Sequence, residues 1–380
     1  MSQLAVGIVS TQKGWRGGEE QALLLAEGLR SRGHCCQILA LHGGRFAERM
    51  AAEGFDVQTF SGSRFNPVTL WNVRNLLKRN YYDVLHFNDA HALTIAGMAS
   101  QGLQVPVRVM ARRVDFDIRS PSRYRRICDR VICVSQAVSD VCFRCGIPLD
   151  QLCVVHDGVD PKRVASGDRS RGRRALELSD DRPLLLVVSS LTDHKGHRFL
   201  LDAMPQVLAN YPRVQLALAG SGELLEALQS QAAGRGIGEA IRFLGFRKDV
   251  PDLIHAADLV VQPSHLEGLC SSLIDVMLAG RPIVATTAGG IPELLGPLET
   301  DRQPVSWLVP PRNPGALAEA ICDALADADQ CEVYSWQAQR RAFAEFVADR
   351  MVDRTLAVYQ DILAAKGFEA PDADDRRSAA

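Results

Sequence analysis

The sequence alternates short, continuously apolar segments with segments whose apolar residues recur at helical spacing, and it repeats this alternation in two series. Within residues 19–30, for example, Ala22, Leu25 and Leu29 fall on one face of a helix. Apolar segments without internal alternation are typical of parallel strands that helices cover on both faces. We therefore predict an α/β protein with two doubly wound, Rossmann-like domains that face each other across a cleft.

Strands are predicted where apolar segments are bounded by turn residues. In the first half these segments are 4–10, 35–41, 82–87, 105–110, 131–134 and 152–155. In the second half they are 184–188, 214–219, 241–244, 259–262 and 282–285, with a helix near 197–210. Residues 161–183 are rich in Arg, Ser, Gly and Asp and are predicted to connect two domains.

The predicted domains follow from that connection. Residues 1–165 form the first, completed by a C-terminal helix at about 346–366, and residues 183–345 form the second. Residues 367–380 end in a polar segment that we predict to be a flexible tail.

Charge is divided unequally between the halves, although the formal net charge is only −2. Residues 1–182 carry 26 Lys and Arg against 19 Asp and Glu, whereas residues 183–380 carry 17 against 26. The densest basic segment, 108–130, contains eight Arg. We expect any anion-seeking surface to lie in the first domain. Nucleic acid is not expected as a partner, because the basic segment lacks interleaved aromatic residues and the second half is acidic.

The sequence contains no window approaching the roughly 18 uninterrupted apolar residues of a membrane span. Its beginning also lacks the apolar stretch of a signal peptide, so we expect a cytoplasmic protein with ten reduced cysteines. Cys142 and Cys145 form a CxxC pair without a second pair at zinc-binding spacing. Asp115 and Asp117 are flanked by arginines, which favours ion pairs over a metal site, and no metal is expected.

Loops that follow predicted strands carry the candidate binding residues. Gly17 and Gly18 lead into the first helix, a pattern that suits either close approach of an anion or a simple tight turn. Lys195 is predicted to open a helix after the strand 184–188, where its flexible charge can reach a phosphate. Glu267 follows another strand and Asp275 lies on the next helix, so both can face one ligand near that helix's N-terminus.

The second half resembles the nucleotide-sugar-binding domain of the family-4 retaining glycosyltransferases, which have the GT-B fold. The ordered motifs are Lys195-Gly196, Gly220 and Gly222, Gly245 with Asp249, Ser264, Glu267-Gly268, Asp275, Gly280-Arg281-Pro282 and Gly289-Gly290-Ile291-Pro292-Glu293. The first half resembles the family's acceptor domain more loosely. Its matching segments are Gly17-Gly18-Glu19, 86–91 (HFNDAH), 111–116 (ARRVDF), 129–135 (DRVICVS) and 156–160 (HDGVD).

The resemblance implies a retaining transfer of a sugar from a nucleotide-sugar donor to an acceptor hydroxyl, in cell-envelope lipopolysaccharide or polysaccharide biosynthesis. It implies no cofactor, with Lys195 on the donor diphosphate, Glu267 on the sugar hydroxyls and Asp275 on the ribose. The backbone near Phe246 and Arg247 would receive the base. The implied donor-binding residues are Gly18, Ser190, Lys195, Gly220, Gly222, Phe246, Arg247, Glu267, Gly268, Leu269 and Asp275.

Three positions depart from the family pattern. Ser190 stands where the family has Arg, and Asp275 stands where Glu is usual. Asn88 replaces the second histidine of an H-x-H motif that begins at His86. His91 is therefore the candidate for the catalytic role beside the donor sugar, together with Glu267 and Lys195, and Asp89 is the alternative to His91.

Candidate acceptor-binding residues come from the basic first half. They are His86, Asp89, Arg112, Arg113 and Asp115. For His86, a satisfied core histidine is the alternative interpretation. Arginines 112 and 113 favour an anionic or lipid-linked saccharide, and their charge would suit peripheral contact with the cytoplasmic face of the inner membrane.

Two other functions are compatible with the same residues. A sugar-nucleotide 2-epimerase shares the two-domain fold, and the departures at Ser190, Asn88 and Asp275 would suit a catalytically silent scaffold protein of GT-B fold.

Overall fold

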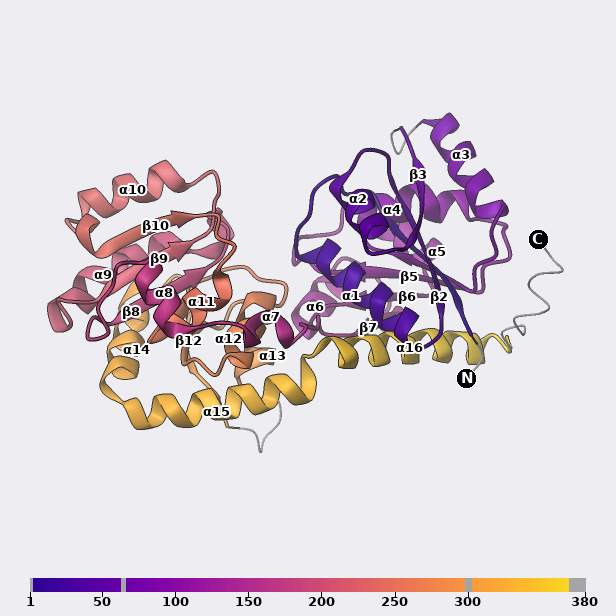
Figure 1. Ribbon diagram of the computed structural model, residues 1–380. Helices are drawn as coiled ribbons and strands as arrows, with labels where there is room; N and C mark the ends of the chain where they lie inside the picture. The colour runs from indigo at the N-terminus through magenta and orange to yellow at the C-terminus, as the bar shows by residue number, and fades with distance from the viewer. Residues whose placement is uncertain (1–2, 63–65, 298–302, 369–380) are drawn as a thin grey trace. The chain divides into compact units, whose positions relative to one another are not determined.

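The computed structural model describes residues 3–62, 66–297 and 303–368, and the chain divides into two compact units (Figure 1). The first unit comprises Met1–Gly158 and Ala348–Ala380, and the second comprises Val159–Val347. Each unit is built on one parallel sheet, which confirms the predicted α/β class with two doubly wound sheets. Among the described residues, no helix is both long and apolar enough to cross a membrane.

The first unit contains a seven-stranded sheet in the order β3-β2-β1-β4-β5-β6-β7, with every neighbouring pair parallel. Its strands are β1 (Ala5–Ser10), β2 (Cys35–Leu41), β3 (Asp56–Phe60), β4 (Val84–Phe87), β5 (Val107–Arg112), β6 (Arg130–Cys133) and β7 (Leu152–Val154). In the register of β1 and β4, Ile8 lies opposite His86.

Helices cover this sheet and supply the rest of its core. They are α1 (Gly17–Ser31), α2 (Arg45–Ala52), α3 (Pro67–Lys78), α4 (Ala90–Ala92), α5 (Pro121–Ile127), α6 (Gln136–Arg144) and α16 (Ala348–Ala365), with a π-helical turn at Leu93–Gly97 and a 3₁₀ turn at Leu149–Gln151. In Figure 1, α16 runs beside α1. The two helices approach so closely that a Cβ on Gly28 would lie 2.4 Å from Val352.

The second unit contains a six-stranded parallel sheet in the order β10-β9-β8-β11-β12-β13. Its strands are β8 (Leu184–Val188), β9 (Gln215–Ala219), β10 (Ile241–Gly245), β11 (Leu259–Gln262), β12 (Ile283–Thr286) and β13 (Trp307–Val309). Strands β8, β9 and β11 are buried over almost their whole length, which explains their continuous apolar sequence.

The helices of this unit pack on both faces of its sheet. They are α7 (Lys162–Ala165), α8 (Arg169–Ala175), α9 (His197–Asn210), α10 (Leu225–Gly234), α11 (Val250–Ala256), α12 (Ser271–Leu278), α13 (Ile291–Leu295), α14 (Pro314–Ala326) and α15 (Ala328–Glu345), with 3₁₀ turns at Asp193–Lys195 and Gly238–Ala240. The core is formed by buried side chains of β8 and β9 against α9 and α14, such as Leu216, Met204 and Ile321.

Residues 161–183 differ from the predicted connection. They contain α7 and α8, and the first unit ends already at Gly158. Helix α8 packs on α11 so closely that a Cβ on Gly172 would lie 2.3 Å from the Asp252 carbonyl oxygen. Arg173 is 2% exposed, and its guanidinium pairs with Asp258 at 2.6 Å, which compensates its buried charge. Residues 369–380 of the predicted tail lie outside the described residues.

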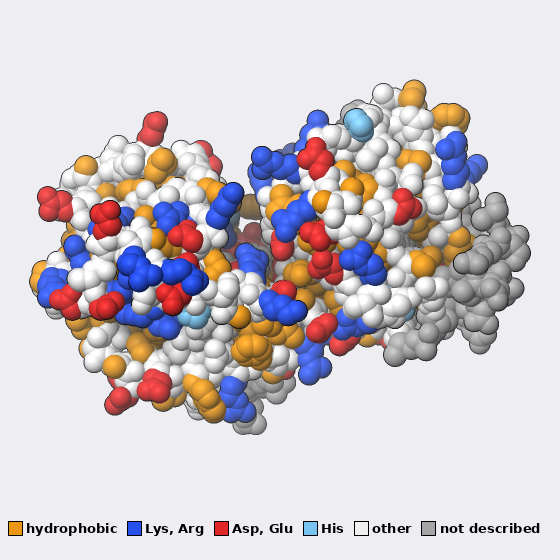
Figure 2. Space-filling model, viewed as in Figure 1, with side chains coloured by type: hydrophobic (Ala, Val, Ile, Leu, Met, Phe, Trp, Pro, Cys, Tyr) orange, Lys and Arg blue, Asp and Glu red, His pale blue; other side chains and the backbone are white. Residues whose placement is uncertain are grey.

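The division into units also changes the distribution of charge. The first unit carries 24 Lys and Arg against 21 Asp and Glu, and the second carries 19 against 24. On the visible face of the second unit, Lys and Arg side chains gather over α8 (Figure 2). The arginines of residues 169–174 therefore belong to the second unit, where Arg169 and Arg173 pair with Asp258 and Arg171 pairs with Asp252.

Candidate functional site

The order of strands in the second unit places a topological switch point between β8 and β11. The chain runs from β8 outward through β9 and β10 on one side, and from β11 outward through β12 and β13 on the other. Crossovers therefore diverge at the carboxyl ends of β8 and β11, where doubly wound sheets bind ligands. The loops that follow these two strands carry Lys195 and Glu267.

An ion pair joins the two loops at this point. Lys195 Nζ lies 2.8 Å from both carboxylate oxygens of Glu267. The two side chains are 16% and 7% exposed, so the pair is largely shielded from water but still reachable. Lys195 ends a 3₁₀ turn before α9 instead of opening the helix as predicted.

A chain of hydrogen bonds between buried side chains orients the Glu267 carboxylate. Ser264 Oγ donates to Glu267 Oε2 at 3.1 Å, and Gln262 Nε2 donates to Ser264 Oγ at 2.8 Å. Both supporting residues are at most 1% exposed. Gln262 was missed in the sequence, whereas the S-x-x-E spacing of Ser264 and Glu267 was visible there.

Close backbone packing fixes the loop that carries Glu267. The His265 amide donates to the His194 carbonyl at 2.9 Å, which ties this loop to the turn that holds Lys195. Gly289 adopts a left-handed φ of 51°, and a Cβ there would lie 1.7 Å from the Glu267 carbonyl oxygen. Position 289 therefore requires glycine both for its conformation and for its clearance.

The loop after β9 packs closely against the backbone of residues 189–191, which follow β8. A Cβ on Gly220 would lie 1.9 Å from the Ser189 carbonyl oxygen, and one on Gly222 would lie 2.3 Å from that of Leu191. Ser190 is exposed, and its hydroxyl lies 3.3 Å from Thr192 Oγ1. The structure thus brings Ser190, Gly220 and Gly222 together at the same edge of the sheet.

Asp275 lies on α12, the helix that begins shortly after Glu267. Its side chain is 5% exposed, and Arg163 Nη2 of α7 lies 3.4 Å from its Oδ2. No sequence motif indicated Arg163, because it lies in the predicted connection. Between Glu267 and α12, Gly268 is half-buried and Leu269 is buried, while Cys270 adopts a left-handed φ of 75° at the helix N-cap.

The loop after β10 carries the two residues expected near the base. Phe246 is 76% exposed. Arg247 Nε donates to Asp249 Oδ1 at 2.7 Å, and its guanidinium lowers the pKa of the Asp249 carboxyl below the ordinary value. The side chain of Arg247 is thus engaged by Asp249, whereas Phe246 presents an uncovered ring.

The first unit has its own switch point between β1 and β4. Asp89 accepts hydrogen bonds there from the Thr11 amide at 2.7 Å and the Thr11 hydroxyl at 2.6 Å. It also caps α4 by accepting from the His91 and Ala92 amides. Both oxygens of Asp89 therefore bond to the protein, contrary to its expected role on the acceptor. His91, by contrast, has an exposed side chain.

His86 is a core residue and not part of an acceptor surface. It is 2% exposed, and its Nδ1 lies 2.7 Å from the Tyr359 hydroxyl of α16. Burial lowers the pKa of His86 to about 3, so the ring is neutral at physiological pH. The expectation that His86 binds the acceptor is wrong, since β4 places its side chain within the sheet's packed face.

The two arginines expected to face an anionic acceptor are also bonded within the protein. Arg112 is 8% exposed and donates to the Phe116 carbonyl. Arg113 donates to Asp157 Oδ1 at 3.1 Å and to Asn88 Oδ1 at 2.7 Å. The sequence gives no sign of the Arg113 pair, because its partner Asp157 lies 44 residues away along the chain.

The Arg113 network reaches the first helix as well. Asn88 Nδ2 donates to the Gly18 carbonyl at 3.2 Å, so the departure at position 88 links α1 to Arg113. Burial raises the pKa of the Asp157 carboxyl, while Arg113 opposes that rise. Asp115 is half-buried on the loop that follows β5.

Two thiols of the first unit lie close together. Cys133 Sγ and Cys142 Sγ are 3.9 Å apart, and all ten cysteines are free. Within the described ranges, no three His, Cys, Asp or Glu residues gather in a way that could hold a metal ion.

Family models match both parts of the chain. The model described as glycosyl transferases group 1 matches residues 168–341, and the one described as glycosyltransferase family 4 matches residues 15–163. Among curated proteins, a glycosyltransferase of Methanocaldococcus jannaschii without an assigned reaction is 28% identical over 61% of the chain and 60% of its own length. A D-inositol 3-phosphate glycosyltransferase of Geodermatophilus obscurus is 36% identical over 54% of the chain and 46% of its own length. The matched region thus spans about half the length of these relatives.

Solved structures share the same architecture. The Anabaena protein HepE, crystallised with UDP and glucose, superposes with a TM-score of 0.81 at 22% identity and covers 94% of this chain and 100% of its own. At that identity the likeness shows the fold.

Proposed function

Because the chain belongs to the group 1 and family 4 glycosyltransferases of GT-B fold, we propose that it transfers a sugar from a nucleotide-sugar donor to an acceptor hydroxyl with retention of configuration. The observation that carries this proposal is the Lys195–Glu267 pair at the switch point of the second unit. A cation and a carboxylate held side by side match the two chemically distinct parts of such a donor, its diphosphate and its sugar hydroxyls.

Lys195 would bind the diphosphate. The leaving group is a nucleoside diphosphate, so negative charge grows on phosphate oxygens as the sugar departs. The ammonium of Lys195 and the N-terminal amides of α12 would stabilise that charge, and we propose that no metal ion is needed. Since Glu267 already holds Lys195, the ammonium needs little reorganisation before it meets a phosphate oxygen.

Glu267 would accept hydrogen bonds from the donor's sugar hydroxyls. Its carboxylate is fixed by Ser264 and, through Ser264, by Gln262, so its direction does not depend on the ligand. Asp275 would bind the ribose, and Arg163, 3.4 Å from its Oδ2, would orient its carboxylate. The HepE complex with UDP and glucose supports a donor of this class.

His91 is the proposed catalytic residue of the first unit. Asp89 is engaged by Thr11 and by the amides of α4, which leaves its oxygens poorly placed to serve a substrate. The His91 side chain is exposed and forms no hydrogen bond with the described residues, and α4, which carries it, follows β4 at the switch point of the sheet. This contrast favours His91 over Asp89 for contact with the reacting sugar.

The acceptor would be an anionic or lipid-linked saccharide of the cell envelope, reached from the cytoplasmic side of the membrane. The loop after β5 exposes Val114 and Phe116 next to the exposed Arg119, a combination that suits an acceptor with both apolar and anionic parts. One relative is named D-inositol 3-phosphate glycosyltransferase, and inositol 3-phosphate is an anion. This name supports an anionic acceptor.

A product assay tests this function. The protein is incubated with UDP-, GDP-, ADP- and CMP-sugars, each with and without an envelope extract, and release of free nucleotide and the anomeric configuration of the product are measured. Release that depends on the extract, with retention, supports the proposal. Epimerised donor without extract would identify an epimerase, and donor binding without any release would identify a silent scaffold.

A further inference from the structure

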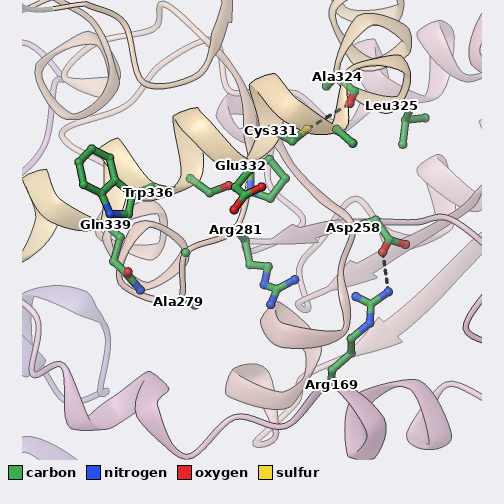
Figure 3. Close-up of a pocket in the computed structure, with 14 residues that line it drawn as sticks. Arg169, Asp258, Ala279, Arg281, Ala324, Leu325, Cys331, Glu332, Trp336 and Gln339 are labelled. Carbon is green, nitrogen blue, oxygen red and sulfur yellow. Dashed lines mark hydrogen bonds and ion pairs between the residues drawn. The ribbon is translucent and has the colours of Figure 1, made fainter.

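A pocket in the second unit lies at the end of the sheet opposite to Lys195 and Glu267. It is lined by the turn that joins α12 to β12, by Asp258 before β11, by the end of α14 and by one face of α15 (Figure 3). Its volume is about 610 Å³, within the range of about 300–1,000 Å³ that is usual for small-molecule sites. The motif Gly280-Arg281-Pro282 lines this pocket and lies away from the donor loops.

Arg281 is the central polar group of the pocket. Among the described residues, its guanidinium donates no hydrogen bond and forms no ion pair, and its Nε is buried. Burial lowers the pKa of Arg281, nearby Arg169 lowers it further, and Asp258 opposes them. A guanidinium is nearly always charged in proteins, so Arg281 is a partly buried cation whose charge Asp258 compensates only from a distance.

Asp258, the acid whose charge acts on Arg281, is already paired with other arginines. Asp258 Oδ1 lies 2.7 Å from Arg169 Nη2, and Asp258 Oδ2 lies 2.6 Å from Arg173 Nη2. In Figure 3 the Arg169–Asp258 pair lies beside Arg281, and Glu332 lies on the α15 wall. Glu332 forms no ion pair with any described residue. Arg169, Arg173 and Arg281 thus outnumber Asp258 at the floor, while Glu332 adds one carboxylate on the wall.

Apolar and aromatic surface completes the pocket. Trp336 of α15 is 56% exposed, and the guanidinium of Arg340 lies 4.6 Å from its ring centroid. Ala324, Leu325 and Ala328 line the same pocket. We propose that this pocket binds a small molecule that carries an oxyanion next to an apolar or aromatic group, with Arg281 pairing with the oxyanion and Trp336 contacting the ring.

Calorimetric titration of the full chain with phenyl phosphate and with benzoate tests this site, and the two probes separate a phosphate ester from a carboxylate. Wild-type protein is compared with Arg281→Gln, with Lys195→Ala and with the control Arg235→Gln, whose arginine pairs with Asp202 away from the pocket. At least one probe should bind wild type, Lys195→Ala and Arg235→Gln equally, and should bind Arg281→Gln about tenfold more weakly or not at all.

Three results would overturn the proposal: no binding of either probe to wild type, equal affinity in Arg281→Gln, or binding that is lost in Lys195→Ala and kept in Arg281→Gln. The last result would assign the anion to the donor loops. Should Arg281→Gln fail to fold, Trp336→Ala replaces it, because that side chain is largely exposed. The Trp336→Ala variant should bind phenyl phosphate or benzoate more weakly than wild type. Unchanged affinity for both probes would equally contradict the proposed site.

Discussion

Lys195 Nζ lies 2.8 Å from each carboxylate oxygen of Glu267, although the two residues are 72 positions apart in the chain. The pair joins the loop after β8 to the loop after β11, the two strands that flank the switch point of the second sheet. Because each charge is neutralised by the other, a diphosphate can share Lys195 without the cost of burying a single unpaired charge.

Removing the carboxylate should abolish donor recognition while the fold survives. Glu267→Ala leaves Lys195 without its partner and removes the proposed acceptor for sugar hydroxyls, so kcat/KM for transfer should fall by about 100-fold or more. Steady-state kinetics measure this loss. The exposed Glu226→Ala serves as the control and should retain wild-type kinetics. Unchanged transfer by Glu267→Ala would show that the pair is only structural.

The close packing of Gly289 against the Glu267 backbone predicts that a side chain at position 289 displaces the loop that carries Glu267. Gly289→Ala introduces a Cβ that would lie 1.7 Å from the Glu267 carbonyl oxygen, in a left-handed conformation. The loop must move, so we expect a loss of about 2 kcal/mol or more in the free energy of unfolding and weaker nucleotide binding. Urea denaturation and titration measure the two effects. Gly234→Ala, where nothing lies within 4 Å of the added Cβ, should change neither by much.

The sheets were largely predictable, because buried parallel strands leave continuous apolar segments such as 184–188 and 259–262. Of the four edge strands, β7 and β10 were predicted, whereas β3 and β13 were not. Strand β3 reads Asp-Val-Gln-Thr-Phe with mostly exposed or half-buried positions, and β13 has only three residues. Neither produces the pattern of a buried strand, so both were missed.

The chemistry of the arginines was the least predictable part of the site. Arg113 and Arg173 were expected in solvent-facing or connecting segments, but their partners Asp157 and Asp258 lie 44 and 85 residues away. A single sequence shows only which charges are neighbours along the chain. It does not show which acid each arginine contacts in the folded protein. Lys195 and Glu267 were identifiable because local motifs mark each of them, although their mutual contact was not.

The Arg113–Asp157 pair should contribute to stability more than to acceptor binding. Arg113→Ala leaves the largely buried Asp157 carboxylate without its cation and should lower the free energy of unfolding by about 1–3 kcal/mol. Adding Asp157→Asn should recover part of that loss. A double-mutant cycle in urea would then give a coupling energy of about 1 kcal/mol or more. Strictly additive losses, with a rise only in the acceptor KM, would instead favour the acceptor role first expected for Arg113.

Buried His86 predicts a specific dependence of stability on pH. Its folded pKa of about 3 lies below the ordinary value of 6.5, so the unfolded chain binds more protons between these values. Stability should therefore fall as pH drops below about 6.5, by at most about 1.4 kcal/mol per pH unit from this group. His86→Asn should lose that part of the acid sensitivity when urea midpoints are compared at pH 7.5 and pH 5. The exposed His42→Asn is the control, and an identical pH dependence in wild type and His86→Asn would refute the assignment.

The most direct test of the account is calorimetric binding of UDP, GDP, ADP and CDP to wild-type protein, to Lys195→Ala and to Lys78→Ala, whose lysine is exposed on α3 in the first unit. We predict that at least one nucleoside diphosphate binds wild type and Lys78→Ala with the same Kd, and that its Kd rises about tenfold or more in Lys195→Ala, a loss of about 1.4 kcal/mol. Failure of every diphosphate to bind wild type, or equal affinity in Lys195→Ala, would contradict a donor site at the Lys195–Glu267 pair.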